Sequence, residues 1–198
     1  MPILKTLVIL PLLIYQCIKA FGLDAPLHGY GVDILTWEVK VFPREPPMNF
    51  SGTIQEVQAQ INKVNPKWNA TYFNGASEKR RENRPVFYQT ICGPGPYGWN
   101  EADASSIKYG INYLGGLIFS KPINGPGTGN CGRVSCSYNS AIWWCNDNTV
   151  PYQLDSFSAI ADGALNILKS CTDDFATVGQ IFAIGNWNVI VRGDNDNC

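Results

Sequence analysis

The chain has one histidine in 198 residues, His28, and it lies close to the N-terminus. Catalysis by a serine or cysteine nucleophile with a histidine base needs this side chain, and so does a histidine proton shuttle near neutral pH. Both mechanisms are therefore excluded for any processed product of the chain that lacks His28.

Cysteine is absent between residues 21 and 91, although the chain has seven. Cys17 belongs to residues 1–20, where Lys5 precedes a largely apolar run that ends near the small residue Ala20. This layout is typical of a secretory signal peptide, and the run is too short for a membrane span. No later run approaches a spanning length. We therefore expect a secreted, extracellular protein without stable membrane insertion.

The six cysteines that follow residue 91 are an even number in an exported chain, which predicts three disulfides. Their spacing does not match a zinc knuckle, and an oxidising compartment favours disulfides over metal binding. We therefore expect neither a metal nor a cofactor, while the residues themselves leave every connectivity open. The six are Cys92, Cys131, Cys136, Cys145, Cys171 and Cys198.

Positive charge is scarce from residue 82 onward, where ten Asp and Glu outnumber six Lys and Arg, a net charge of −4. Such a surface is a poor match for nucleic acid, which we do not expect as a partner. Basic residues cluster instead at Lys79, Arg80 and Arg81. In a secreted chain a dibasic pair is typical of proteolytic processing, and we expect residues 21–81 to be removed as a pro-segment. The alternative is a solvated charge run.

The pro-segment carries patterns that predict a small strand, helix and strand unit. Residues 34–42 alternate between apolar and polar, as in a half-buried strand, and residues 53–64 open with a capping-box spacing before helical apolar intervals. We expect residues 67–73 to return as a second strand. The unit is too small to be stable alone, so it should pack on the later part of the chain. Asn49 and Asn69 begin candidate glycosylation sequons.

The later part of the chain predicts two helices and a terminal hairpin. Residues 100–116 place apolar side chains on one stripe and end in two glycines. Residues 154–171 show a stronger stripe, with Asp155 as the candidate N-cap. A β-rich run on either side of Gly185–Asn186 predicts the hairpin.

A further hairpin is predicted in the cysteine-rich centre of the chain. With Asn139–Ser140 as a two-residue turn, Cys136 lies opposite Trp143, and Cys145 joins them on the face that receives a helix. Trp144 then points to the outer face. In this register Cys136 and Cys145 are diagonal neighbours at roughly 7–8 Å, too far apart for a disulfide, so each should bridge to another element.

Carboxylates offer the remaining route to catalysis, since glycoside hydrolysis needs an acid and a base of this kind. Asp155 is better explained as a helix cap, Asp103 as a first-turn acid and Asp147 as a turn residue, so the spacing singles out no pair. A carboxylate-dependent hydrolase therefore stays an alternative. The candidates are Glu101, Asp103, Asp147, Asp155 and Asp162.

Carbohydrate binding on exposed aromatic rings is a further alternative. Aromatic residues of a small disulfide-rich domain belong to its core more often than to a sugar site. A structural wall or surface protein is a third class, which predicts neither a ligand nor toxicity. The candidate sugar platforms are Tyr97, Trp99, Trp144 and Trp187.

The order of cysteines and predicted elements from Cys92 to Cys198 is distinctive. A cysteine precedes the first helix, "RVSCSYNSAIWW" forms a strand pair, a helix ends in "LKSC", and the strand "NWNVIVRG" precedes the last cysteine. This order resembles the virus-encoded killer toxins of smut fungi and the killer-toxin-like small secreted proteins of fungi. For residues 82–198 the resemblance implies a disulfide-stapled α+β fold, an antiparallel sheet with two helices on one face. The small β-α-β pro-segment predicted from the residues precedes this domain and is additional to the minimal toxin pattern.

The resemblance also implies a way of acting. Killer toxins act on ion channels of target cells through basic residues near the strand that corresponds to the central hairpin. The nearest candidate here is Arg133, with Trp144 on the expected outer face. We therefore expect a monomeric secreted effector or killer-toxin-like binding protein that acts on a protein or cell-surface target of a host or competitor. The implied disulfides are Cys92 with Cys171, Cys136 with Cys198, and Cys131 with Cys145, the last of which requires a different hairpin register.

Overall fold

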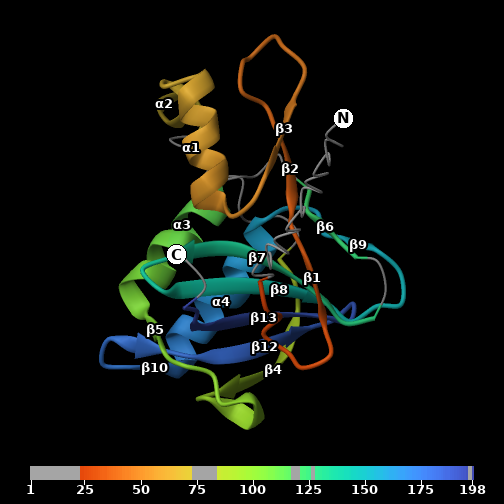
Figure 1. Ribbon diagram of the computed structural model, residues 1–198, viewed down its shortest axis with the longest axis vertical. Coiled ribbons are helices and arrows are strands. Elements are labelled where there is room, and N and C mark those ends of the chain that lie inside the picture. The colour runs from red at the N-terminus through yellow and green to blue at the C-terminus, as the bar shows by residue number, and fades with distance from the viewer. Residues whose placement is uncertain (1–22, 73–83, 117–120, 126–127, 196–197) are drawn as a thin grey trace, which may run out of the picture.

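A six-stranded sheet forms the centre of the molecule (Figure 1). The computed structural model describes residues 23–72, 84–116, 121–125, 128–195 and 198. Neighbouring strands are antiparallel, except that β1 at one edge runs parallel to β7. In spatial order the strands are β1 (Gly31–Asp33), β7 (Asn130–Ser137), β8 (Ser140–Asn146), β13 (Trp187–Gly193), β12 (Gly179–Ala183) and β4 (Phe87–Cys92).

Two helices, α3 (Ala104–Gly116) and α4 (Ser158–Cys171), pack on one face of this sheet (Figure 1). The α+β fold with two helices on one face is therefore confirmed. The predicted cap of α4 is wrong, because the first helical N–H, that of Ser158, donates to Ser156 Oγ at 2.9 Å. Asp155 is instead exposed, with its carboxylate 4.0 Å from the Lys121 ammonium.

The central hairpin, β7 and β8, has a different register from the predicted one. Its turn is Tyr138–Asn139, and both residues have the left-handed backbone, φ 50° and 54°, that this two-residue turn requires. A bulge at Val134 then shifts the pairing, so that Cys131 lies opposite Cys145. The predicted turn at Asn139–Ser140 is wrong because strand alternation alone reveals neither the bulge nor the place of the turn.

The observed register decides which side chains face the helices. Val134, Ile142 and Trp144 lie in the core beneath α3 and α4, whereas Trp143 lies on the opposite face with the cysteines of the hairpin. The expectations that a helix covers Trp143 and that Trp144 points outward are therefore wrong. Both tryptophans are fully buried: Trp144 lies beneath the helices, and Trp143 is covered by residues from early in the chain, such as Leu27.

The early segment, residues 23–72, forms a hairpin followed by two helices. The capping box is confirmed, since Thr53 N–H donates to Glu56 Oε2 at 2.7 Å. The strand predicted over residues 67–73 is wrong: a short helix stands there, and it buries Trp68, whose indole N–H donates to Lys40 O at 2.9 Å. The elements are β2 (Thr36–Val39), β3 (Met48–Ser51), α1 (Ile54–Val64) and α2 (Trp68–Tyr72).

The early segment packs on the late segment, residues 84–198, as expected. Trp37 of β2 stacks on Phe157 beside α4, with ring centroids 3.7 Å apart. The Gln55 side chain of α1 donates to Ser135 Oγ at 2.7 Å and accepts from Cys136 N–H at 3.0 Å. The early segment thus belongs to the core beneath the helices and also binds the edge of β7 beyond β1.

The start of the early segment covers the opposite face of the sheet. Leu27 packs in the cluster around Trp143, and Pro26 O accepts a hydrogen bond from the Trp99 indole at 2.8 Å. The Tyr30 hydroxyl donates to Asp147 Oδ1 at 2.9 Å. Residues 23–72 therefore contribute to both cores of the molecule.

Short ribbons and turns complete the fold. The hairpin predicted at Gly185–Asn186 is confirmed, and both residues have positive φ between β12 and β13. The remaining elements are β5 (Ala102–Asp103), β10 (Thr172–Asp173) and β11 (Ala176–Thr177) in one small sheet, β6 (Ile123–Asn124) and β9 (Tyr152–Gln153) in another, and a 3-10 turn at Gly95–Tyr97.

Three disulfides are present, and they are the pairs that the resemblance implies: Cys92–Cys171, Cys136–Cys198 and Cys131–Cys145. In the part of the chain that the structure describes, no helix is long and apolar enough to cross a membrane. The expected signal peptide, residues 1–20, and the dibasic site at Lys79, Arg80 and Arg81 lie outside the described residues.

Candidate functional site

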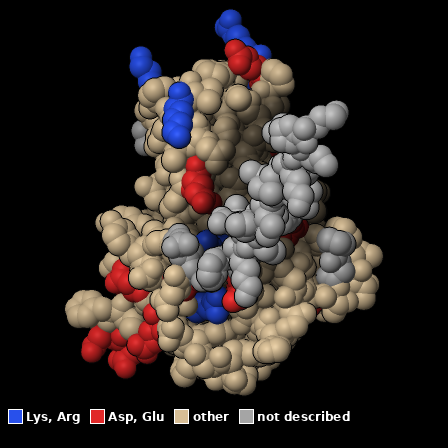
Figure 2. All heavy atoms as spheres, in the orientation of Figure 1, with Lys and Arg blue, Asp and Glu red and all other residues tan. Residues whose placement is uncertain are grey.

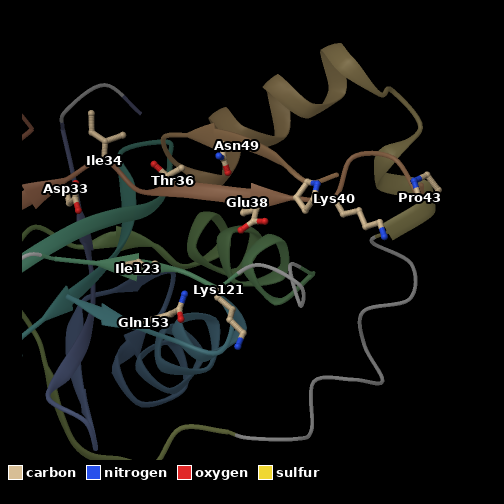
Figure 3. Close-up of a pocket in the computed structure, with 11 residues that line it drawn as sticks. Asp33, Ile34, Thr36, Glu38, Lys40, Pro43, Asn49, Lys121, Ile123 and Gln153 are labelled. Carbon is tan, nitrogen blue, oxygen red and sulfur yellow. The ribbon is translucent and has the colours of Figure 1, made fainter. Parts of the chain in front are cut away.

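A groove runs between two β-ribbons that come from different segments of the chain (Figure 3). One wall is the outer face of the β2–β3 hairpin, and the other is the β6–β9 ribbon. The groove has a volume of about 890 Å³, within the usual range for ligand sites. We call it the ribbon groove, and its main lining residues are Asp33, Thr36, Glu38, Lys40, Asn49, Lys121, Ile123 and Gln153.

Strand alternation orients the first wall. In β2, Trp37 and Val39 point into the core, and the Trp37 indole N–H donates to Gly52 O at 2.7 Å. Because side chains alternate along a strand, Thr36 and Glu38 must point the other way, into the groove. The buried tryptophan therefore fixes the direction of the groove-lining residues.

A buried asparagine orients the second wall. Asn124 of β6 is fully buried, and its side-chain amide donates to Trp144 O at 2.8 Å and to Asn130 O at 3.2 Å. Its neighbour Ile123 consequently points outward and lines the groove opposite Thr36. Each wall is thus anchored by a buried residue, Trp37 in the first and Asn124 in the second, which fixes the position of both walls.

Among the described residues, the groove lining carries charges of both signs and no aromatic side chain. Figure 3 shows Asp33 at one end and Lys40 toward the other, with Glu38 between them and Lys121 on the facing wall. Such a lining offers hydrogen bonds and ion pairs along its length. None of these described lining residues offers a flat ring on which a sugar could stack.

Of the two predicted binding residues, neither lies in the ribbon groove. Trp144 is 0% exposed, so its prediction as a surface residue is wrong. The Arg133 side chain is 12% exposed; its guanidinium lies 3.6 Å from the Asp194 carboxylate and 5.9 Å from the centre of the Trp143 ring. Arg133 also lines a second cavity, about 780 Å³, beside α1.

The proposed sugar platforms are mostly core residues. Trp99, Trp144 and Trp187 are buried, and Trp99 uses its indole N–H within the fold. Tyr97 is exposed, but its ring stacks on Trp99 at 5.1 Å. The aromatic array expected for carbohydrate binding is therefore not formed by these residues.

Two of the predicted carboxylates, Asp103 and Asp147, have structural partners within the fold. Asp103 Oδ1 accepts from both Ser106 N–H and Ser106 Oγ–H at 2.7 Å, and these bonds lower the pKa of Asp103. A general acid needs a raised pKa instead. Asp147 is held by Tyr30 and by the Asn188 amide at 2.8 Å. Burial, followed by the hydrogen bond and the charge of Asp147, raises the pKa of Tyr30 to about 12.

One acidic cavity was not predicted from the sequence. Glu101 and Asp103 line it together with Asp173 and Asp174 from the tip of the β10–β11 hairpin. In Figure 2 acidic side chains gather at the lower left, over β5 and β10 in the orientation of Figure 1. Among the described residues no group of His, Cys, Asp and Glu is arranged to hold a metal ion.

The two candidate glycosylation sites differ in their surroundings. Asn49 is exposed on β3 and lines the ribbon groove, so a glycan there would stand at the groove. Asn69 is half-buried in α2, and its Oδ1 accepts a hydrogen bond from the Gln58 amide at 3.0 Å. Of the two, Asn49 is the more accessible.

No protein-family model, no curated protein and no solved structure matches the chain. The alternation of apolar and polar residues at 34–42 was enough to predict which side chains of β2 point away from the core, toward the groove. No sequence signal placed Lys121, Ile123 and Gln153 opposite that strand, because this contact joins parts of the chain that are far apart.

Proposed function

We propose that the chain is a secreted binding protein of the effector or killer-toxin-like class, whose ribbon groove holds an extended segment of a protein target. The groove carries this proposal, since its two ribbons enclose a volume of about 890 Å³, and the described lining residues have charges of both signs and no aromatic ring. An extended peptide supplies backbone amides and charged side chains to such a lining. A sugar or a nucleic acid matches it less well.

The killer-toxin-like class rests on the order of cysteines and elements. The three disulfides are the pairs that this resemblance implies, which supports the class. The groove also uses the early segment, which is additional to the minimal toxin pattern. We therefore place recognition of the target in the ribbon groove rather than at Arg133, whose side chain is largely buried.

The structural hydrogen bonds of Asp103 and Asp147 favour a binding function over a catalytic one. Asp103 caps α3 and Asp147 anchors Tyr30 and Asn188, so these side chains are already committed to the fold. The groove residues Asp33, Glu38, Lys40 and Lys121 supply charges for recognition without a histidine.

The test is to apply purified, secreted protein to plant and fungal cells and to measure saturable binding of a labelled sample, together with growth arrest or an immune response. We expect binding to one of these cell types. Thr36→Trp should weaken it at least about tenfold, because the new side chain fills the groove. Tyr109→Trp, a large side chain at an exposed position of α3 away from the groove, should bind like the native protein.

A folded Thr36→Trp variant that binds as the native protein does would exclude the groove as the recognition site. Absence of saturable binding to every cell type would contradict the proposed effector or toxin-like function. Native-like near-ultraviolet circular dichroism of both variants is the control for folding.

A further inference from the structure

Strand β4 is an open edge of the central sheet. In the described part of the chain its only strand partner is β12, and it forms the lower edge of the sheet in Figure 1. On the opposite side of the sheet, by contrast, the edge of β7 beyond β1 is bound by the Gln55 side chain through Ser135 and Cys136. Within the described ranges, no comparable side chain covers the β4 edge.

The β4 edge lacks most of the devices that keep edge strands from pairing. Natural edge strands carry charges, especially lysine, or proline, and both block the addition of another strand. No residue from Pro85 to Asn100 is charged, and β4 itself, Phe87–Cys92, contains no proline. Among the described residues, one bulge near Tyr88 is the single protective feature, and the rest of the strand is regular.

An apolar patch adjoins this edge. Tyr88 is 65% exposed, with its ring 6.2 Å from that of Phe182 on the neighbouring strand. Val86 and Ile184 are also exposed, and Ile184 N–H donates to Val86 O at 2.9 Å. We call these four residues, Val86, Tyr88, Phe182 and Ile184, the β4 patch.

We infer that the β4 edge is a self-association surface, on which a second copy of this chain adds its own β4 in antiparallel orientation. A two-fold axis across the edge brings the same patch from both copies together, which buries apolar side chains and pairs the open backbone groups. No like charges meet there, because residues 85–100 and 175–191 are uncharged. A strongly charged partner would gain nothing from this surface.

The edge is also held in place before it binds. The Cys92–Cys171 disulfide ties the end of β4 to the end of α4, so that the strand loses little freedom on pairing. The expected product is a symmetric dimer rather than an open fibre, because one copy uses its single β4 edge against the same edge of the other.

Sedimentation velocity of the full-length secreted protein over about 1 to 100 μM tests this inference. We expect the native protein to shift from monomer to dimer as its concentration rises. Tyr88→Lys should weaken the dimer at least about tenfold, because it places a charge of the same sign on both sides of the axis. Tyr109→Lys is the matched control, since Tyr109 is 64% exposed on α3, and it should dimerise like the native protein.

A native protein that stays monomeric over the whole range would overturn the inference, and so would a Tyr88→Lys variant that dimerises as tightly as the Tyr109→Lys control. Ile184→Lys provides a second variant of the patch if Tyr88→Lys does not fold. Thr36→Trp should dimerise normally, which separates this surface from the ribbon groove.

Discussion

Trp37 joins the two segments at the level of a single residue. Its ring stacks on Phe157 of the late segment, and its indole N–H is bonded to Gly52 O within the early segment. Because it is fully buried, its removal leaves a large cavity between the two segments.

Trp37→Ala should therefore lower the free energy of unfolding by about 3 to 5 kcal/mol in a denaturant titration. Tyr109→Ala, at an exposed position of α3, is the control and should change it by less than about 0.5 kcal/mol. A similarly small effect of Trp37→Ala would mean that the segments do not share a core.

The ionisation of Tyr30 makes the free energy of unfolding depend on pH in the alkaline range. Its pKa rises from the ordinary 10.0 to about 12, so the fold favours the neutral phenol. The stabilisation is fully present below the unfolded pKa of 10.0 and is lost as the pH rises through about 12.

An NMR titration of tyrosine Cζ carbons should show one resonance with a midpoint near pH 12, and Tyr30→Phe should remove it. The variant should also lose less stability than the native protein between the unfolded and folded pKa. Persistence of the late-titrating resonance in Tyr30→Phe would show that another tyrosine is responsible.

At the scale of elements, local patterns were sufficient for the three long helices and insufficient for α2 and for the pairing of β7 with β8. The capping box and apolar spacing correctly predicted α1, and apolar stripes correctly predicted α3 and α4. The turn of the central hairpin and the bulge at Val134 were missed, because both depend on backbone geometry that alternation does not encode. Residues 67–73 became a helix because Trp68 is buried against Lys40, a tertiary contact.

The three disulfides should differ in how readily they are reduced, since thiol exchange requires access to the sulfur atoms. Cys92 is exposed at the end of β4, whereas Cys131 and Cys145 are fully buried between β7 and β8. Under native conditions a phosphine reductant should therefore open Cys92–Cys171 first and Cys131–Cys145 last.

Alkylation followed by mass spectrometry reports this order. Reduction of Cys92–Cys171, whose cysteines are 79 residues apart in sequence, should lower the free energy of unfolding by about 4 kcal/mol in the chain-entropy model. Alkylation of Cys131 before Cys92 would contradict the burial seen in the structure.

At the scale of the whole molecule, the early and late segments form the ribbon groove together. β2 and β3 supply one wall, and β6 and β9 supply the other. Cleavage at the dibasic site, residues 79–81, stays a prediction. If the chain is cut there, no disulfide joins the pieces, because residues 21–91 contain no cysteine. Packing around Trp37 and Leu27 should nevertheless keep the pieces together.

The sequence could not show this shared site, because its walls are separated by long stretches of chain. Composition placed the cysteines in the late segment and favoured a removable pro-segment, while the contacts of Gln55 and Tyr30 tie that segment to the sheet. The early segment is therefore a structural part of the described molecule, whatever the fate of the connecting residues.

The most direct test of a binding site shared by both segments uses a specific protease site placed between Tyr72 and Arg84. The labelled protein is cut there, and its binding to the target cells is measured before and after the early piece is removed by denaturation and refolding. We predict that the cut, unseparated protein binds as the intact protein does, and that the late piece alone loses binding. A late piece that binds as tightly as the intact protein would contradict the account.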